Sequence, residues 1–125
     1  MKTYLTVSVA LLTGMAIGGF AVQSLHAQGK KAYTVTENEV LDAKLAPAFG
    51  EKVVAAQATA GGRNLKTGGG KVTAMEGTAP ARVAIVEWES LAKAEAWFKS
   101  KEWNDLAPER EKALKTIRRY VVEER

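Results

Sequence analysis

The spacing of apolar and polar residues changes along the first half of the chain. Residues 31–40, "KAYTVTENEV", alternate with a period of two, which is typical of a strand. In residues 41–60 the apolar side chains recur every three to four positions, which predicts a helix with Asp42 as its cap. The face that this helix would bury consists of Leu45, Phe49, Val53 and Ala56.

Two further strands are predicted between residues 61 and 89. The glycine-rich stretch 61–77, "GGRNLKTGGGKVTAMEG", is interpreted as a strand in two pieces, with a bulge or loop at Gly68–Gly70. Residues 81–89, "ARVAIVEWE", carry apolar side chains on both faces of a strand. Because such a strand is covered on both sides, we place it in the middle of the sheet.

The last third of the chain is predicted to form a helix and a final strand. Residues 90–115 have helical spacing, with Ser90 as the N-cap. Pro108 is expected to break or kink this helix, because proline lacks an N–H and clashes with the preceding turn. The packed stripe before the break consists of Leu91, Ala94, Trp97 and Phe98. Residues 116–124, "TIRRYVVEE", are predicted to be the last strand.

The order strand, helix, strand, strand, helix, strand is that of a ferredoxin-like split βαβ domain. In this α+β fold both helices cover one face of an antiparallel sheet. The opposite face also carries apolar residues and needs a cover of its own. A second copy packed sheet to sheet is the simplest cover, so we expect a homodimer in the form of a dimeric α+β barrel.

An apolar leader precedes this domain. Lys2 is followed by a long uncharged stretch that contains "LTVSVALLTGMAIGGFAV". A positive start, an apolar middle and a small residue before a polar one predict a signal peptide over residues 1–27. Cleavage is expected after Ala27 or, alternatively, after Ser24, and the protein is then exported to the periplasm or secreted. An uncleaved leader of roughly 18 apolar residues would instead anchor the single domain of residues 28–125 to a membrane.

The composition excludes several classes of chemistry. The chain has no cysteine, and its one histidine, His26, lies in the leader. The remaining domain therefore has no thiol nucleophile, no imidazole base and no His or Cys metal ligand, and we predict neither a metal site nor a cofactor. The formal net charge of +4 becomes +3 when Lys2 leaves with the leader, and both signs are interleaved. This balance, together with export, argues against a nucleic-acid partner.

Five stretches of the sequence resemble the family catalogued as domain of unknown function 1330. They are "GGRNLKTGGG", "MEG", "RVAIVEWES", "AEAWFKSKEW" and a later "ER", and the likeness spans about residues 32–124. The resemblance implies a ferredoxin-like unit paired into a dimeric α+β barrel, and it implies no established activity. The chain departs from the family pattern at four positions, because Asn64 stands for an aromatic residue, Lys66 for arginine, and Phe98 and Trp103 each for tyrosine.

Glu87 is the candidate for acid–base catalysis. On the central strand it shares a face with Val83 and Ile85, so alternation points it toward apolar surroundings. A buried carboxylate must find a cation or hydrogen-bond donors, or its pKa rises, and either state suits binding or catalysis. The alternatives are that Glu87 is wet at the end of the sheet or forms a structural pair with an arginine.

Arg110 is the candidate anchor for an acidic ligand. It begins a helical spacing that continues at Ala113, Leu114 and Ile117, so we expect it over the sheet or at the rim of a pocket. The alternative is a structural ion pair with Glu87 or Glu76. Trp88 and Trp103 are expected to line a pocket or a dimer contact.

Two functions of different classes fit these residues. In the first, the dimer encloses an apolar cavity that binds or transforms a small aromatic or acidic molecule, with contacts from Arg63, Glu87, Trp97 and Arg110. In the second, the domain is a non-catalytic periplasmic structural or interaction module without a pocket. A lined cavity would favour the first function, and an uncovered apolar patch would favour the second.

Overall fold

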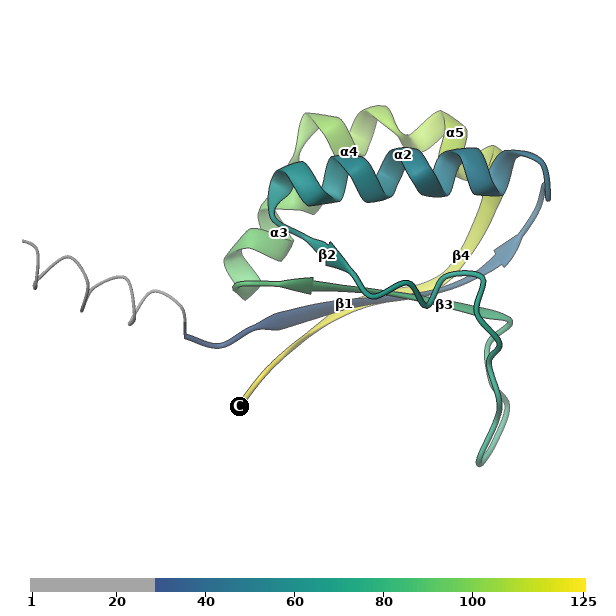
Figure 1. Ribbon diagram of the computed structural model, residues 1–125, viewed down its shortest axis with the longest axis horizontal. Coiled ribbons are helices and arrows are strands. Elements are labelled where there is room, and N and C mark those ends of the chain that lie inside the picture. The colour runs from purple at the N-terminus through teal and green to yellow at the C-terminus, as the bar shows by residue number, and fades with distance from the viewer. Residues whose placement is uncertain (1–28) are drawn as a thin grey trace, which may run out of the picture.

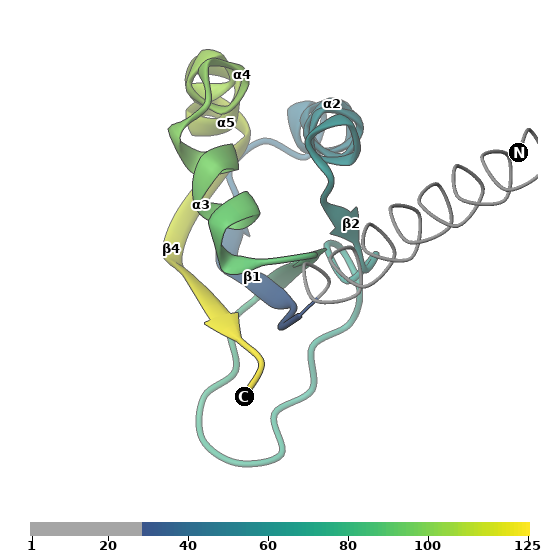
Figure 2. The ribbon, with the colours of Figure 1, turned by 90° about the vertical axis from the view of Figure 1, so that its left-hand side faces the viewer.

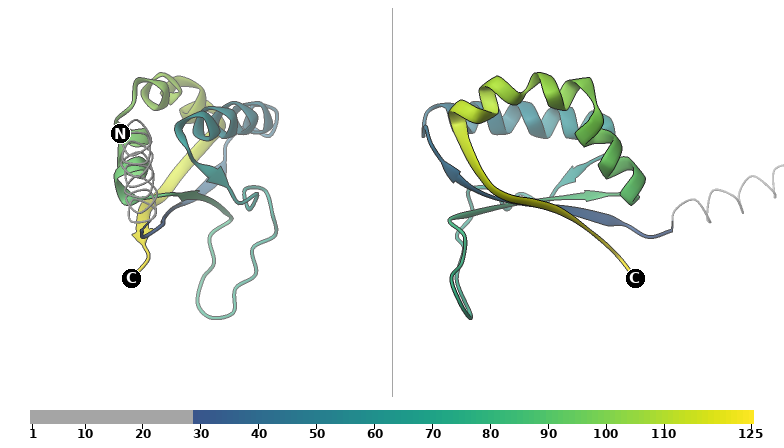
Figure 3. Two further views of the ribbon diagram at one scale, coloured as in Figure 1. Left: turned by 60° about the vertical axis from the view of Figure 1, so that its left-hand side comes forward. Right: turned by 180° about the vertical axis from the view of Figure 1, so that it is seen from behind.

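The computed structural model describes residues 29–125, and the predicted signal peptide lies outside them. Its elements are β1 (Ala32–Val40), α2 (Leu45–Ala60), β2 (Arg63–Asn64), β3 (Arg82–Trp88), α3 (Leu91–Lys99), α4 (Lys101–Asp105), α5 (Ala107–Ala113) and β4 (Leu114–Glu123). The strands form one antiparallel sheet in the order β2-β3-β1-β4, and these helices lie on one face of it (Figures 1 and 3). The expected α+β, ferredoxin-like fold and the central place of β3 are confirmed.

The predicted strand over residues 61–77 is largely wrong. Only Arg63–Asn64 pairs with β3, and soon afterwards the chain turns at Lys66, whose φ of 61° is left-handed. Residues 65–81 form a long irregular connection, most of which projects past the sheet on the side away from the helices (Figures 1 and 2). Glycine weakens a strand interior, and Gly69 adopts a φ of 86° that a strand does not allow.

The predicted helix over residues 90–115 consists of three short helices. α3 gives way to α4 at Ser100, whose hydroxyl accepts the N–H of Trp103, and the spacing of apolar residues did not reveal this break. The break expected at Pro108 lies two residues earlier, at Leu106. Pro108 then occupies the first turn of α5, where its missing N–H leaves no intrahelical bond unmade.

The expected helical face after Arg110 is also wrong. The helix ends at Ala113, and Leu114 and Ile117 belong to β4. β4 pairs with β1 along most of its length. Its β-branched and aromatic residues therefore lie in a sheet, which they favour, and do not continue the helix. The N–H of Leu41 donates to the carbonyl of Ala113 (2.9 Å), so the last carbonyl of α5 has a hydrogen-bond partner outside the helix.

Asp42 at one end of α2 and Gly61 at the other explain where this helix begins and ends. The carboxylate of Asp42 accepts the N–H of Leu45 (3.1 Å), so Asp42 caps the helix as expected. At the other end Gly61 has a φ of 98°, the left-handed conformation that commonly ends a helix. A Cβ atom on Gly62 would lie 2.7 Å from the ring of Trp88, so only glycine allows the chain to pass this close to the core.

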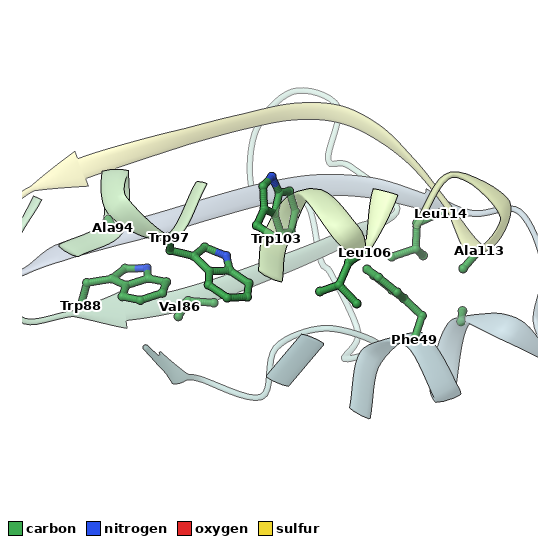
Figure 4. Close-up of a cluster of buried hydrophobic side chains, with 10 residues drawn as sticks. Phe49, Val86, Trp88, Ala94, Trp97, Trp103, Leu106, Ala113 and Leu114 are labelled. Atoms are coloured by element: carbon green, nitrogen blue, oxygen red, sulfur yellow. The ribbon is translucent and has the colours of Figure 1, made fainter. Parts of the chain in front are cut away.

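The core between the helices and the sheet contains a row of aromatic side chains (Figure 4). The ring centroids of Trp88 and Trp97 are 6.2 Å apart, and those of Trp97 and Trp103 are 5.8 Å apart. Phe98 meets Trp103 edge-on at 5.0 Å. Trp97 and Phe98 therefore pack in the core as expected. Trp88 is fully buried, with its Nε1 donating to the hydroxyl of Thr34 (3.2 Å), so it is a core residue and no part of an exposed surface.

Candidate functional site

A cavity of about 650 Å³ lies between the sheet and the helices. Figure 2 shows α2 and the α4–α5 pair side by side above the sheet. The floor of the cavity comes from β1, β3 and β4, and its roof comes from α2 together with Phe98, Trp103 and Arg110. Because strand side chains alternate between the two faces, only every second residue of β1, such as Thr34 and Thr36, reaches this cavity.

Two arginines lie over the same tryptophan at the cavity wall. The guanidinium carbon of Arg110 is 4.0 Å from the ring centroid of Trp103, and that of Arg119 is 4.6 Å from the same centroid. Arg119 also donates to the hydroxyls of Thr36 (3.2 Å) and Thr116 (3.3 Å). These contacts fix the two planar cations beside one aromatic surface, which is a favourable cation–π arrangement.

A third arginine lines the cavity from β3. Arg82 donates to Oδ1 of Asn38 (3.1 Å) on the neighbouring strand. Among the described residues, none of the three cavity arginines forms an ion pair with a carboxylate. The acidic side chain that does line the cavity, Glu51, is exposed on α2. The cavity therefore has an excess of positive charge.

Partial burial makes these cations costly to keep charged. Burial lowers the pKa of Arg82 and of Arg110 below the ordinary arginine value. For Arg119 burial and then the nearby charge of Arg110 lower the pKa to about 10. All three remain protonated at neutral pH, so the cavity presents hydrogen-bond donors and positive charge to whatever enters it.

Glu87 and Arg63 lie on the opposite face of the sheet from this cavity. Oε2 of Glu87 is 2.6 Å from Arg63 and its Oε1 is 3.0 Å from Lys31. The hydrogen bond from Arg63, and then that from Lys31, lower the pKa of Glu87, so its carboxylate is held ionised. This is the structural ion pair that the sequence offered as an alternative, with Arg63 as the partner.

Trp97 lies on the helix side of the sheet but lines a different pocket. That pocket measures about 520 Å³ and has α2 on one side and the α3–α4 segment on the other. Trp97 is 2 % exposed, and its Nε1 has no hydrogen-bond partner among the described residues. The four residues proposed from the sequence are thus divided between two faces of the sheet, and of these only Arg110 lines the larger cavity.

The ion pair of Arg110 with Glu87 or Glu76, considered from the sequence, does not form. Arg110 contacts Trp103 instead, where its Nη1 also approaches the backbone carbonyl (3.5 Å). Arg82 and Arg119 were not predicted as site residues from the sequence. A signal existed for Arg82, because it occupies the same alternating face as Ala84, Val86 and Trp88.

The face of the sheet away from the helices is apolar at its centre and charged toward its ends. Its apolar residues include Tyr120 and Val122, whose exposed fractions are 45 % and 51 %. Glu87, with its partners Arg63 and Lys31, lies toward one end of this open face. The ion pair of Glu37 and Arg118 (2.6 Å) lies toward the other end. The open face therefore combines an apolar centre with charges of both signs.

Two further classes of site were sought in residues 29–125. In this range no cluster of three or more acidic, His or Cys side chains is placed to hold a metal ion. No described helix is both long enough and apolar enough to span a membrane.

Comparisons with solved structures show likeness at low sequence identity. A protein of unknown function from Rhodopseudomonas palustris is 12 % identical, with a TM-score of 0.55 over 83 % of this chain and 90 % of that chain. HapK from Hahella chejuensis is 12 % identical, with a TM-score of 0.48 over 75 % of this chain and 92 % of that one. A dimeric protein of unknown function and ferredoxin-like fold from Bacteroides fragilis is 11 % identical, with a TM-score of 0.45 over 77 % and 95 % of the two chains.

The first of these likenesses shows a shared fold and nothing about activity. No curated protein matches the sequence significantly. The family described as "Domain of unknown function (DUF1330)" matches residues 31–124. This match covers nearly all of the described residues, in agreement with the resemblance seen in the sequence, and the chain therefore belongs to the DUF1330 family.

Proposed function

We propose that the cavity between the helices and the sheet binds a small molecule with an apolar body and an anionic group. The observation that carries this proposal is the pair of guanidiniums of Arg110 and Arg119, partly buried beside Trp103 and without a carboxylate partner within residues 29–125. Burying an unpaired charge is unfavourable, and a carboxylate or phosphate from a ligand would compensate both cations. Arg82 adds a third positive group to the same cavity.

The size and the walls of the cavity agree with a small organic ligand. About 650 Å³ lies within the ordinary range for small-molecule sites. Phe49, Val53, Phe98 and Trp103 provide apolar and aromatic surface against which an aromatic ring would pack. We therefore favour an aromatic acid over a fully polar anion such as free phosphate.

The proposal assigns binding and no reaction step. The cavity arginines stabilise negative charge, but protonated guanidiniums do not serve as bases at neutral pH. Glu87, the catalytic candidate from the sequence, is ion-paired on the opposite face of the sheet. We give Glu87 and Arg63 a role in holding the edge strand β2 to β3, where their Cα atoms are partners.

Binding is tested by calorimetric titration of the purified protein with a panel of aromatic and aliphatic carboxylates and their neutral amides. We expect a carboxylate to bind and its amide to bind much more weakly. Arg110→Gln and Arg119→Gln should each weaken carboxylate binding by about 10- to 100-fold, because each removes a charge-assisted hydrogen bond. Lys112→Gln, an exposed substitution on the same helix as Arg110, is the matched control. Carboxylate binding that is unaffected by both arginine variants would contradict the proposal.

We also propose that the open face of the sheet packs against the same face of a second copy. Tyr120 and Val122 are exposed on it, and the face carries charges of both signs, so it is complementary to itself about a two-fold axis. Light scattering after gel filtration should give the mass of a dimer, and Tyr120→Lys should give a monomer. Leu41→Lys, which places the same charge at an exposed apolar residue outside the strands, should remain dimeric. A monomeric wild type would refute this second proposal.

Export remains part of the proposed function. The leader of residues 1–27 has the composition of a signal peptide, and the mature protein would then begin at Gln28, or at Leu25 if cleavage follows Ser24. Intact-mass measurement on periplasmic and membrane fractions of a bacterial host tests this. A chain that keeps Met1 and stays in the membrane fraction would instead support the uncleaved anchor.

A further inference from the structure

Gln57 is a buried polar residue whose side-chain oxygen is unpaired among the described residues. It lies on the last turn of α2, is 7 % exposed and lines the cavity of the proposed ligand. Its Oε1 has no hydrogen-bond partner among the described residues. Nearly all buried side-chain amides in proteins are hydrogen-bonded, so an unpaired one on a residue that lines a binding cavity indicates a partner supplied from outside the chain.

The other uncharged polar side chains that line the cavity are already engaged. Thr34 accepts from Trp88, Thr36 and Thr116 accept from Arg119, Asn38 accepts from Arg82, and the side chain of Asn64 accepts the backbone N–H of Lys66. Each of these contacts orients a residue of the protein itself. Gln57 differs from these neighbours, because its Oε1 has no hydrogen-bond partner in the described part of the chain.

Gln57 and Arg119 belong to different parts of the cavity. The backbone carbonyl of Gln57 accepts the N–H of Gly62, which packs against Trp88. On the sheet, Trp88 is opposite Ala32 of β1, whereas Arg119 is opposite Thr36. Those two β1 residues are four positions apart, or about 13 Å along a strand. A ligand anchored at Arg119 would thus meet Gln57 with a group remote from its anionic end.

We infer that the ligand carries a hydroxyl group, distant from its acid group, that hydrogen-bonds the side-chain amide of Gln57. This inference rests on the proposed function and narrows its ligand to hydroxylated acids with an apolar body, such as phenolic acids. A hydroxyl both donates and accepts, so it satisfies the amide in either orientation of its oxygen and nitrogen. The site would then contact the ligand at two points. The arginines would bind its acid group, and the amide of Gln57 would form a neutral hydrogen bond with its hydroxyl.

The test compares ligands that differ only at the remote group. Calorimetric titrations of the wild-type protein use phenylacetate, its 2-, 3- and 4-hydroxy derivatives and the methyl derivatives of the same shape. We expect the 3- or the 4-hydroxy derivative, whose hydroxyl lies away from the acid group, to bind about 3- to 10-fold more tightly than its methyl counterpart, the gain from one buried neutral hydrogen bond. The 2-hydroxy derivative, whose hydroxyl adjoins the acid group, should show no such gain. This comparison needs no variant, so it stands even if substitution at position 57 impairs folding.

Gln57→Met supplies the second measurement. Methionine has a similar shape and no donor or acceptor of comparable strength, so the ratio of hydroxy to methyl affinity should fall to about one. Phenylacetate itself, which lacks the hydroxyl, should bind Gln57→Met as it binds the wild type. Thr59→Ala, an exposed change on the same turn that does not line this cavity, should leave the ratio unchanged.

The outcomes separate this inference from the proposed function. If no carboxylate of this series or of the wider panel binds in a manner that depends on Arg110 or Arg119, the proposed function fails and the inference with it. If the compounds bind through Arg119 but the 3- and 4-methyl derivatives equal or exceed their hydroxy counterparts, only the inference is overturned. Equal weakening of phenylacetate and its hydroxy derivatives in Gln57→Met would likewise overturn it, because the amide would then have a structural role.

Discussion

Replacing Arg119 by methionine should stabilise the ligand-free protein. Burial and then the charge of Arg110 lower the pKa of Arg119 well below the ordinary arginine value, to about 10, and each pKa unit corresponds to about 1.4 kcal/mol. The full penalty would be about 3 kcal/mol, but Arg119 is partly exposed, and solvent screening reduces the expected gain to about 1–2 kcal/mol. Methionine removes the charge and keeps apolar contact with Phe98 and Trp103, over which the guanidinium now lies.

The neighbouring arginine provides a control of opposite sign. Arg118 points to the other face of the sheet and binds the carboxylate of Glu37 through two nitrogens, at 3.0 and 2.6 Å. Arg118→Met leaves that buried carboxylate unpaired, so it should destabilise the protein. Two identical substitutions at adjacent positions should therefore move stability in opposite directions.

Urea denaturation followed by tryptophan fluorescence measures both effects. For a domain of this size, 1 kcal/mol corresponds to about 4–8 °C in melting temperature, so thermal melts give an independent reading. Because the folded-state pKa of Arg119 is depressed, its penalty is present at every pH below about 10, and the gain should not change between pH 6 and 8. A clear loss of stability in Arg119→Met would refute the argument. It would show that the hydrogen bonds to two threonines outweigh the cost of burial.

Three further predictions concern the fold. Gly62→Ala places a Cβ atom 2.7 Å from the Trp88 ring, so urea denaturation should show a loss of about 1–3 kcal/mol. The arginine hydrogen bond lowers the pKa of Glu37, so this residue contributes stability above about pH 4.5 that is lost on further acidification. Melts from pH 7 to pH 3 should therefore show a shallower fall for Glu37→Gln than for wild type, whereas the exposed Glu39→Gln should follow wild type. Ser100→Ala removes the cap of α4 and should cost about 1 kcal/mol in the same denaturation assay, and an unchanged midpoint would contradict the capping role.

The elements that the sequence predicted well are those with a clean period. Residues 33–37 alternate along the segment 31–40, which forms β1 over nearly the same span. The two-sided apolar pattern of residues 81–89 correctly placed β3 inside the sheet. The stretch 61–77 has no such period, and its glycines are compatible with either a strand or a loop. Its conformation is therefore set by tertiary contacts that the local sequence does not show. Ser100 was missed as a break because a serine inside a helical pattern also fits an exposed helix position.

The candidate site could be predicted only in part, for a geometric reason. Alternation correctly put Glu87 on one face with Val83 and Ile85. Both faces of β3 are apolar, however, so the pattern did not reveal which face the helices cover, and the cavity lies on the other one. Arg110 lies at the cavity because α5 begins after Leu106 and ends at Ala113. The spacing of apolar residues predicted neither of these boundaries. Arg119 lies in a strand that carries polar residues on both faces. The pattern therefore does not predict which face of this strand points toward the core.

The aromatic row in the core also gives the protein an intrinsic optical reporter. All three tryptophans of the chain stand in this one row, and its last member, Trp103, lies beneath the two cations that would receive the ligand. A molecule entering there would change the surroundings of that indole directly, and excitation energy can pass between rings spaced this closely. Changes in the intrinsic tryptophan fluorescence can therefore be used to screen ligands without a label.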